Sequence, residues 1–158
     1  MKRQKGFSLI ELLIVVAIIL IIAAIAIPNL LKSKMAANES SAVGSLRTYT
    51  TAMVTFSTQC PNLGYPAALT LLGAGPGDCT GANIVDNVLG VAAPTKSGYT
   101  FTYVAGAAAA NGVVSTYTLN ANPVTAGTTG QRRFFSNQTG VIRYNQTAAA
   151  AVTDPPLQ

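Results

Sequence analysis

The residues that could perform catalytic or metal chemistry are few in this chain of 158 residues. It has no histidine, two cysteines and five acidic residues. A zinc site of the histidine and cysteine type is therefore excluded within one chain, and so is a Ser-His-Asp or Cys-His catalytic apparatus. We expect that the protein is not an enzyme and that it uses neither a metal nor another cofactor.

One acid, Glu11, stands where a charge is unusual. It is the only charged residue between Phe7 and Ile27, and a run of about 20 apolar residues is what a helix needs to cross a hydrocarbon core. Three basic residues among the first six favour a cytoplasmic position for that end. A carboxylate at membrane depth costs about 2.5–3.5 kcal/mol on insertion scales, so it normally indicates function and a partner.

The composition favours a membrane or an assembly over a free soluble domain. Charged residues make up only 9% of the chain, against about 25% in soluble proteins. The net charge is +5, but without the first six residues the balance is 7 − 5, or +2. Arg132, Arg133 and Arg143 could form a small basic patch, yet we expect solvated strand residues there. Nucleic acid is therefore not expected as a direct ligand.

Two ordinary explanations of the first 28 residues fit poorly. A secretory signal peptide has a basic start, an apolar stretch and a small-residue cleavage site, and Ala24-Ile25-Ala26 could serve as that site. Its apolar stretch normally carries no charge, whereas Glu11 interrupts this one. A plain membrane anchor has no use for a buried glutamate.

The hexapeptide Gly6-Phe7-Ser8-Leu9-Ile10-Glu11 resembles the prepilin signature of the type IV pilin and pseudopilin family. In that signature a short basic leader ends in glycine, phenylalanine usually follows, and a glutamate is the fifth residue after the cut. The similarity continues to Pro28, where type IV pilins usually carry a helix-bending proline. It covers about the first 30 residues closely.

This resemblance implies how the N-terminus is processed. A membrane aspartyl prepilin peptidase would cut between Gly6 and Phe7 and would N-methylate the new terminus of Phe7. Glu11 lies four residues from Phe7, on the same face of a helix, and it could also meet the ammonium of Phe7 in a neighbouring subunit. Our hypothesis is that Glu11 sets the register of assembly.

A second helical pattern follows Pro28. A proline removes a backbone donor and bends or locally melts a helix; alternatively, Pro28 ends the membrane helix, but the pattern resumes beyond it. We expect an amphipathic helix over residues 29–59 that continues the first and covers a globular domain. Its apolar stripe is Leu31, Met35, Ala42, Leu46, Tyr49, Met53 and Phe56.

The remaining chain predicts a small sheet with long loops. Alternating apolar and threonine residues start a strand at Tyr99, and four short strands suggest an antiparallel arrangement. Cys60 and Cys79 are expected to form a disulfide in an oxidising compartment, with free thiols or a metal pair as alternatives. Residues from Ala148 onward read as a loosely packed tail. The expected strands are 99–104, 113–119, 132–135 and 141–144, with a turn at 137–140.

Together these expectations give an α+β, pilin-like fold, in which a long N-terminal helix packs on an antiparallel sheet of about four strands. The expected parts are a leader (1–6), a transmembrane and assembly helix (7–28), an amphipathic helix (29–59), a disulfide-closed loop region (60–98), the sheet (99–145) and a tail (146–158).

The resemblance leaves two family members open. One is a structural subunit of a type IV pilus, for adhesion, motility or DNA uptake. The other is a pseudopilin of a type II secretion system, whose major forms typically bind calcium through clustered acids, while the acids after residue 59 are widely spaced here. A solitary membrane-anchored binding module, which uses the leader only for export, is a third possibility.

The family also implies partners and location. The precursor would span the inner membrane once and contact its lipid, with the globular part outside the cytoplasm. Processing and assembly would require the prepilin peptidase, an inner-membrane platform protein and a cytoplasmic ATPase. The product would be a homo-oligomer, a helical filament that forms an extracellular pilus or a periplasmic pseudopilus.

Overall fold

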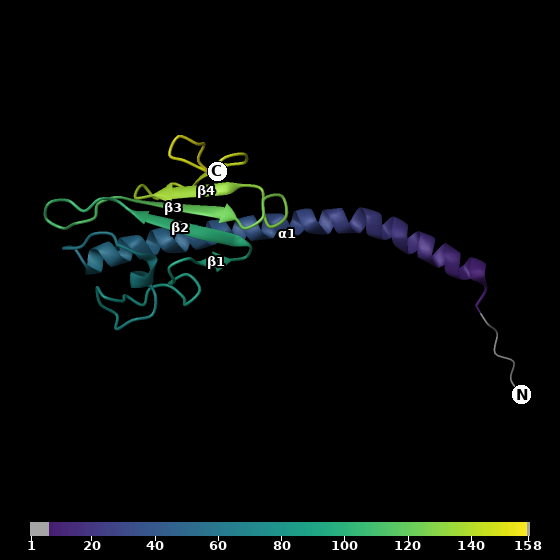
Figure 1. The fold of residues 1–158 in the computed structure, drawn as a ribbon, viewed down its shortest axis with the longest axis horizontal. Coiled ribbons are helices and arrows are strands. Elements are labelled where there is room, and N and C mark those ends of the chain that lie inside the picture. The colour runs from purple at the N-terminus through teal and green to yellow at the C-terminus, as the bar shows by residue number, and fades with distance from the viewer. Residues whose placement is uncertain (1–6, 158) are drawn as a thin grey trace, which may run out of the picture. The chain divides into compact units, whose positions relative to one another are not determined.

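The computed structural model describes residues 7–157 (Figure 1). The described chain divides into two compact units, with the boundary between Lys34 and Met35. We call the described parts the N-terminal unit (7–34) and the globular unit (35–157). The predicted leader, including Gly6 of the cleavage site, lies outside the described residues.

The N-terminal unit is a single stretch of helix. Helix α1 runs from Leu9 to Gln59, and its part up to Lys34 belongs to this unit. Every described residue of the unit except Ala23 is exposed. The helix is long and apolar enough to cross a membrane. It continues through Pro28 without an interruption, so Pro28 neither ends the helix nor melts a turn of it, and a bend there stays a prediction.

In the globular unit, α1 presents the predicted apolar stripe to a core. Ala42, Leu46, Tyr49, Met53 and Phe56 are all buried, which confirms the stripe from residue 42 onward. Met35 is half-buried. Leu31 belongs to the N-terminal unit and is 51% exposed, so the prediction that the buried stripe begins there is wrong.

A five-stranded antiparallel sheet packs on this stripe, in the order β1-β2-β3-β4-β5 along the chain. The predicted α+β fold is confirmed, with one more strand than expected, because β1 lies in the segment predicted as loop. The third strand begins at Tyr117 rather than at Val113 and runs on to Pro123. The strands are β1 (Thr95–Lys96), β2 (Tyr99–Ala105), β3 (Tyr117–Pro123), β4 (Arg133–Asn137) and β5 (Arg143–Asn145).

The core lies between α1 and the inner face of the sheet, as Figure 1 shows for β2, β3 and β4. Alternation along β2 and β3 places aromatic and aliphatic side chains on this face, because neighbouring side chains of a strand point to opposite sides. Tyr99 and Phe101 of β2 are at most 2% exposed. The rings of Phe101 and Tyr49 lie 5.6 Å apart, which joins the helix directly to the sheet.

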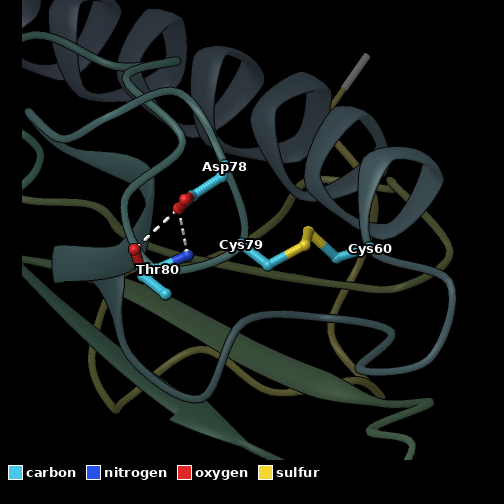
Figure 2. Close-up of a disulfide and its surroundings, with 4 residues drawn as sticks. All are labelled: Cys60, Asp78, Cys79 and Thr80. Atoms are coloured by element: carbon cyan, nitrogen blue, oxygen red, sulfur yellow. Dashed lines mark hydrogen bonds between the residues drawn. A yellow bond between two sulfur atoms is a disulfide. The ribbon is translucent and has the colours of Figure 1, made fainter.

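The loop region after α1 is tied to the helix by a disulfide. Cys60 and Cys79 are bonded (Figure 2), which confirms the predicted pairing and removes the free-thiol and metal alternatives. The region contains one short 3-10 helix, η1 (Leu69–Leu72), which the sequence did not indicate. Residues 84–89 form neither a helix nor a strand.

The C-terminal segment is hydrogen-bonded to the end of the sheet, although most of its residues are exposed. The Arg143 guanidinium donates a hydrogen bond to the Asp154 carbonyl at 2.7 Å, and the Leu157 amide donates to the Ile142 carbonyl at 2.8 Å. Asn145 donates to the Asp154 carboxylate at 3.0 Å. Backbone groups and one carboxylate anchor the segment, although it has few apolar side chains to bury.

Candidate assembly site at the start of helix α1

Phe7 and Glu11 lie together at the start of α1. Phe7 precedes the helix, and its side chain is 84% exposed. Glu11 stands in the first turn. Its Oε2 accepts a hydrogen bond from the backbone amide of Ser8 at 2.8 Å. The structure therefore places Phe7 just before α1 and Glu11 in its first turn, while the pairing of Glu11 with a Phe7 ammonium stays a prediction.

The contact with Ser8 gives Glu11 a local role that the sequence analysis missed. The first amides of a helix have no partner within it, and a glutamate at the third helical position often satisfies the amide of the capping residue. The positive end of the helix dipole also favours a carboxylate there. The spacing Ser8-x-x-Glu11 is the sequence signal that could have revealed this.

The rest of the N-terminal unit surrounds Glu11 with exposed apolar side chains. A helix that is apolar on all sides is buried in a membrane or in a larger assembly. Single exposed apolar residues need no explanation, but a contiguous apolar surface marks an interaction site. The largest exposed side chains near the carboxylate are Leu9 (80%), Ile10 (63%), Leu12 (60%), Leu13 (61%) and Ile14 (52%).

A second glutamate, Glu39, has different surroundings in the globular unit. It does not belong to the apolar stripe predicted from the sequence, yet it is only 7% exposed. It accepts hydrogen bonds from the Gln131 amide at 2.8 Å, the Arg132 amide at 3.0 Å and the Arg132 Nε at 2.7 Å. Nothing in the local sequence near Glu39 indicated these partners, because they are more than 90 residues away.

The electrostatics of Glu39 reflect two opposing effects. Burial acts to raise the pKa of the carboxyl group, while the hydrogen bonds from Arg132 and Gln131 and the charge of Arg132 lower it. The bonds prevail, and the pKa lies below its ordinary value. The ionised Glu39 carboxylate therefore links α1 to the loop before β4 through these hydrogen bonds.

The arginines of the predicted basic patch have structural contacts. Arg132 pairs with Glu39 and lies over the rings of Phe134 and Tyr144, at 5.6 and 5.7 Å from their centroids. Arg133 and Arg143 are half-exposed, and each donates a hydrogen bond to a carbonyl in the C-terminal segment. The expectation of solvated strand residues is wrong for Arg132.

The acids after α1 stay separate from one another. Asp78 accepts hydrogen bonds from Thr80 (Figure 2), Asp86 from Val88, Leu89 and Lys96, and Asp154 from Asn145 and Ala151. Within residues 7–157, no group of three or more potential metal ligands comes together.

Comparison with known proteins gives matches in the N-terminal part of the chain. Residues 1–27 match the family model described as "Prokaryotic N-terminal methylation motif". A type IV wide pilus major component of Thermus thermophilus is 60% identical over 40 residues, which are 25% of this chain and 30% of that protein. A type IV major pilin of Myxococcus xanthus is 52% identical over 54 residues, 34% of this chain and 24% of that protein.

A fimbrial protein of Pseudomonas aeruginosa is 79% identical over 29 residues, 18% of this chain and 19% of that protein. The matched part thus spans less than a third of each of these relatives. No solved structure matches. By its first residues, with the glycine, phenylalanine and glutamate in place, the chain carries the prepilin motif of the type IV pilin and pseudopilin family.

Proposed function

We propose that the protein is a structural subunit of a type IV pilus, and not an enzyme. The observation that carries this proposal is the exposed apolar surface around α1 in the N-terminal unit, with one carboxylate at its start. Water does not favour such a surface, and burial of apolar area is the main driving force of association. The printed names of the similar proteins, which are pilus or fimbrial components, support the same proposal.

In the proposed assembly pathway, the chain is first inserted into the inner membrane. The N-terminal unit spans the bilayer once, surrounded by lipid, and the globular unit lies outside the cytoplasm. A prepilin peptidase cuts between Gly6 and Phe7 and methylates the Phe7 amine, which remains a cation. The disulfide between Cys60 and Cys79 supports an oxidising compartment for the globular unit.

Polymerisation then transfers the apolar helix from lipid into a helical filament. Lipid tails are as apolar as these side chains, so packing and polar contacts must provide specificity. Glu11 would pair with the Phe7 ammonium of a neighbouring subunit, which relieves the cost of a charge in an apolar medium and fixes the register. An inner-membrane platform protein and an ATPase would drive the transfer.

The test is replacement of Glu11 in the full chain, expressed with its own assembly machinery. We expect Glu11→Ala to be cleaved but to reduce sheared filaments at least tenfold. Glu11→Gln keeps an acceptor for the Ser8 amide and removes only the charge, so it separates pairing from capping, and we expect the same loss. Lys32→Ala, which removes an exposed charge of the same helix, is the matched control.

Filaments are measured by electron microscopy and by the amount of protein released on shearing, and cleavage by intact mass. Normal filament numbers in Glu11→Gln would overturn the role of charge pairing. Deletion of the chain distinguishes the alternatives: loss of surface filaments supports a pilus subunit, and loss of protein secretion with normal filaments supports a pseudopilin. A chain that stays in the membrane and never enters a filament would be a solitary binding module.

A further inference from the structure

A pocket of about 310 Å³ opens between two loops of the globular unit, beside the last turns of α1. We call it the loop pocket. Its size falls at the lower end of the range for small-molecule sites in proteins, about 300–1,000 Å³. The main lining side chains are Phe56 of α1, Leu63, Tyr65 and Leu71 from the segment after α1, and Ala108 and Val114 from the loop between β2 and β3.

The two loops are bonded directly to each other, so the loop pocket is formed before any ligand arrives. The Tyr65 amide donates a hydrogen bond to the Val114 carbonyl, and the Val114 amide donates to the Leu63 carbonyl, both at 2.8 Å. Gly64 makes this approach possible. It has a φ of 73°, and a Cβ there would lie 2.2 Å from the Val114 carbonyl oxygen, which no other residue type could accommodate without a shift.

Two further contacts fix the segment after α1, which forms one side of the loop pocket. The disulfide ties Cys60, at the start of the first loop, to Cys79. The Tyr103 hydroxyl of β2 donates a hydrogen bond to the Pro66 carbonyl. A site whose walls are fixed in this way loses little conformational entropy when a ligand binds.

The lining determines the chemical class of ligand. Among the side chains that line the loop pocket, only Tyr65 carries a polar atom. The sequence has no charged residue between Arg47 and Asp78 or between Lys96 and Arg132, and these two stretches supply all of the lining. An ion would lose its hydration without gaining a counter-charge, and a sugar would leave most of its hydroxyl groups unpaired.

We propose that the loop pocket binds a small uncharged apolar molecule, about the size of one ring or two fused rings, with at most one hydrogen-bonding group. An apolar cavity of about 150 Å³ is large enough for benzene, so the larger volume here accommodates a bicyclic compound such as indole. Tyr65 is the only lining residue whose side chain can form a hydrogen bond, so it is the expected partner of the indole nitrogen. This binding does not depend on filament assembly.

The probe is indole, added to the full chain in detergent micelles with isotope-labelled methyl groups. We expect saturable chemical-shift changes at Leu63, Leu71 and Val114, with a dissociation constant of about 1 mM or tighter. Val124 and Val141 are exposed and do not line the loop pocket, so their methyl groups report non-specific binding of indole to the surface of the globular unit. Shifts that do not saturate, or that appear equally at these two valines, would overturn the proposal.

Two variants fill the loop pocket from opposite loops. Ala67→Leu and Ala108→Leu change exposed residues of the lining, so the fold and the disulfide should survive, as mass and tyrosine circular dichroism can check. We expect each to weaken indole binding at least tenfold, while Ala110→Leu, an exposed neighbour outside the lining, leaves it unchanged. Unaltered binding in both filling variants, or equal binding of glucose or benzoate, contradicts the inference.

Discussion

Helix α1 carries one glutamate in the N-terminal unit and one in the globular unit, and the two carboxylates are held in opposite ways. Glu11 is exposed and accepts one hydrogen bond, from an amide three residues away. Glu39 is buried and accepts three, all from Gln131 and Arg132. The first carboxylate can take another partner at little cost, whereas the second cannot leave its partners without releasing a loop.

The apolar side chains of the two units differ in the same way. In the globular unit, apolar side chains from α1, the sheet and the disulfide-closed loop form a buried core, while the large apolar side chains of the N-terminal unit are exposed. The globular unit therefore has a core of its own, whereas the described part of the N-terminal unit has none. It follows that substitutions in the two units should change different measurements.

The largest expected effect on stability is loss of the disulfide. The chain-entropy model gives about 3 kcal/mol for a loop of this length. We expect the double variant Cys60→Ser with Cys79→Ser to lower the free energy of unfolding of the globular unit by about that amount, measured by tyrosine circular dichroism in denaturant. Reduction of the wild-type protein should reproduce the loss, and an unchanged midpoint would show that the loop is held by its other contacts.

Replacement of Glu39 tests the comparison most directly. Glu39→Ala leaves Arg132 and two amides without their acceptor, which we expect to cost about 2–3 kcal/mol, less than for a fully buried pair because Arg132 is one third exposed. Glu11→Ala is the matched control, and it should leave unfolding of the globular unit within about 0.5 kcal/mol of the wild type. If Glu39→Ala and Glu11→Ala lowered the free energy of unfolding of the globular unit equally, the proposed difference between the two glutamates would be wrong.

A smaller effect is expected from a buried tyrosine hydroxyl. The Tyr49 hydroxyl donates to the Leu89 carbonyl at 2.8 Å inside the core. Tyr49→Phe keeps the ring and leaves that carbonyl unpaired, at a cost of about 1–2 kcal/mol. Tyr144→Phe, at a half-buried ring, should be nearly neutral, and a similar loss in both variants would argue against a specific role of the hydroxyl bond.

The smallest expected effect is a pH dependence that belongs to Glu39. Its folded pKa is lower than the ordinary value of 4.5, so its contribution to stability is present above about pH 4.5 and is lost as the pH falls through the folded pKa. Asp78 and Asp86 also have lowered pKa values, so the difference between wild type and Glu39→Gln isolates this part. If the free energies of unfolding of wild type and Glu39→Gln changed in parallel below pH 4.5, Glu39 would not be the source of this pH dependence.

Much of this fold could be predicted because its signals are local. The apolar run, the helical stripe from Ala42 to Phe56 and the alternation at Tyr99 to Val104 each depend on neighbouring residues, and each is present in the structure. The pairing of Cys60 with Cys79 followed from there being two cysteines in a domain expected in an oxidising compartment.

The parts that could not be predicted depend on distant contacts. Glu39 is a charged helix residue outside the apolar stripe, which normally faces solvent. Only the fold brings Arg132 to it. Strand β1 has two residues and forms because β2 offers an edge. The C-terminal segment has little to bury, but Asp154 and the Leu157 amide find partners at Asn145 and Ile142.

Three tyrosines of the core have a consequence for how the surface of this protein can vary. The hydroxyls of Tyr49, Tyr99 and Tyr103 donate to the carbonyls of Leu89, Arg132 and Pro66, each in a different loop. A carbonyl is present whatever the side chain, so these anchors do not depend on loop sequence. The loops can therefore change their exposed residues, and with them what the surface recognises, while the same three rings keep them in place.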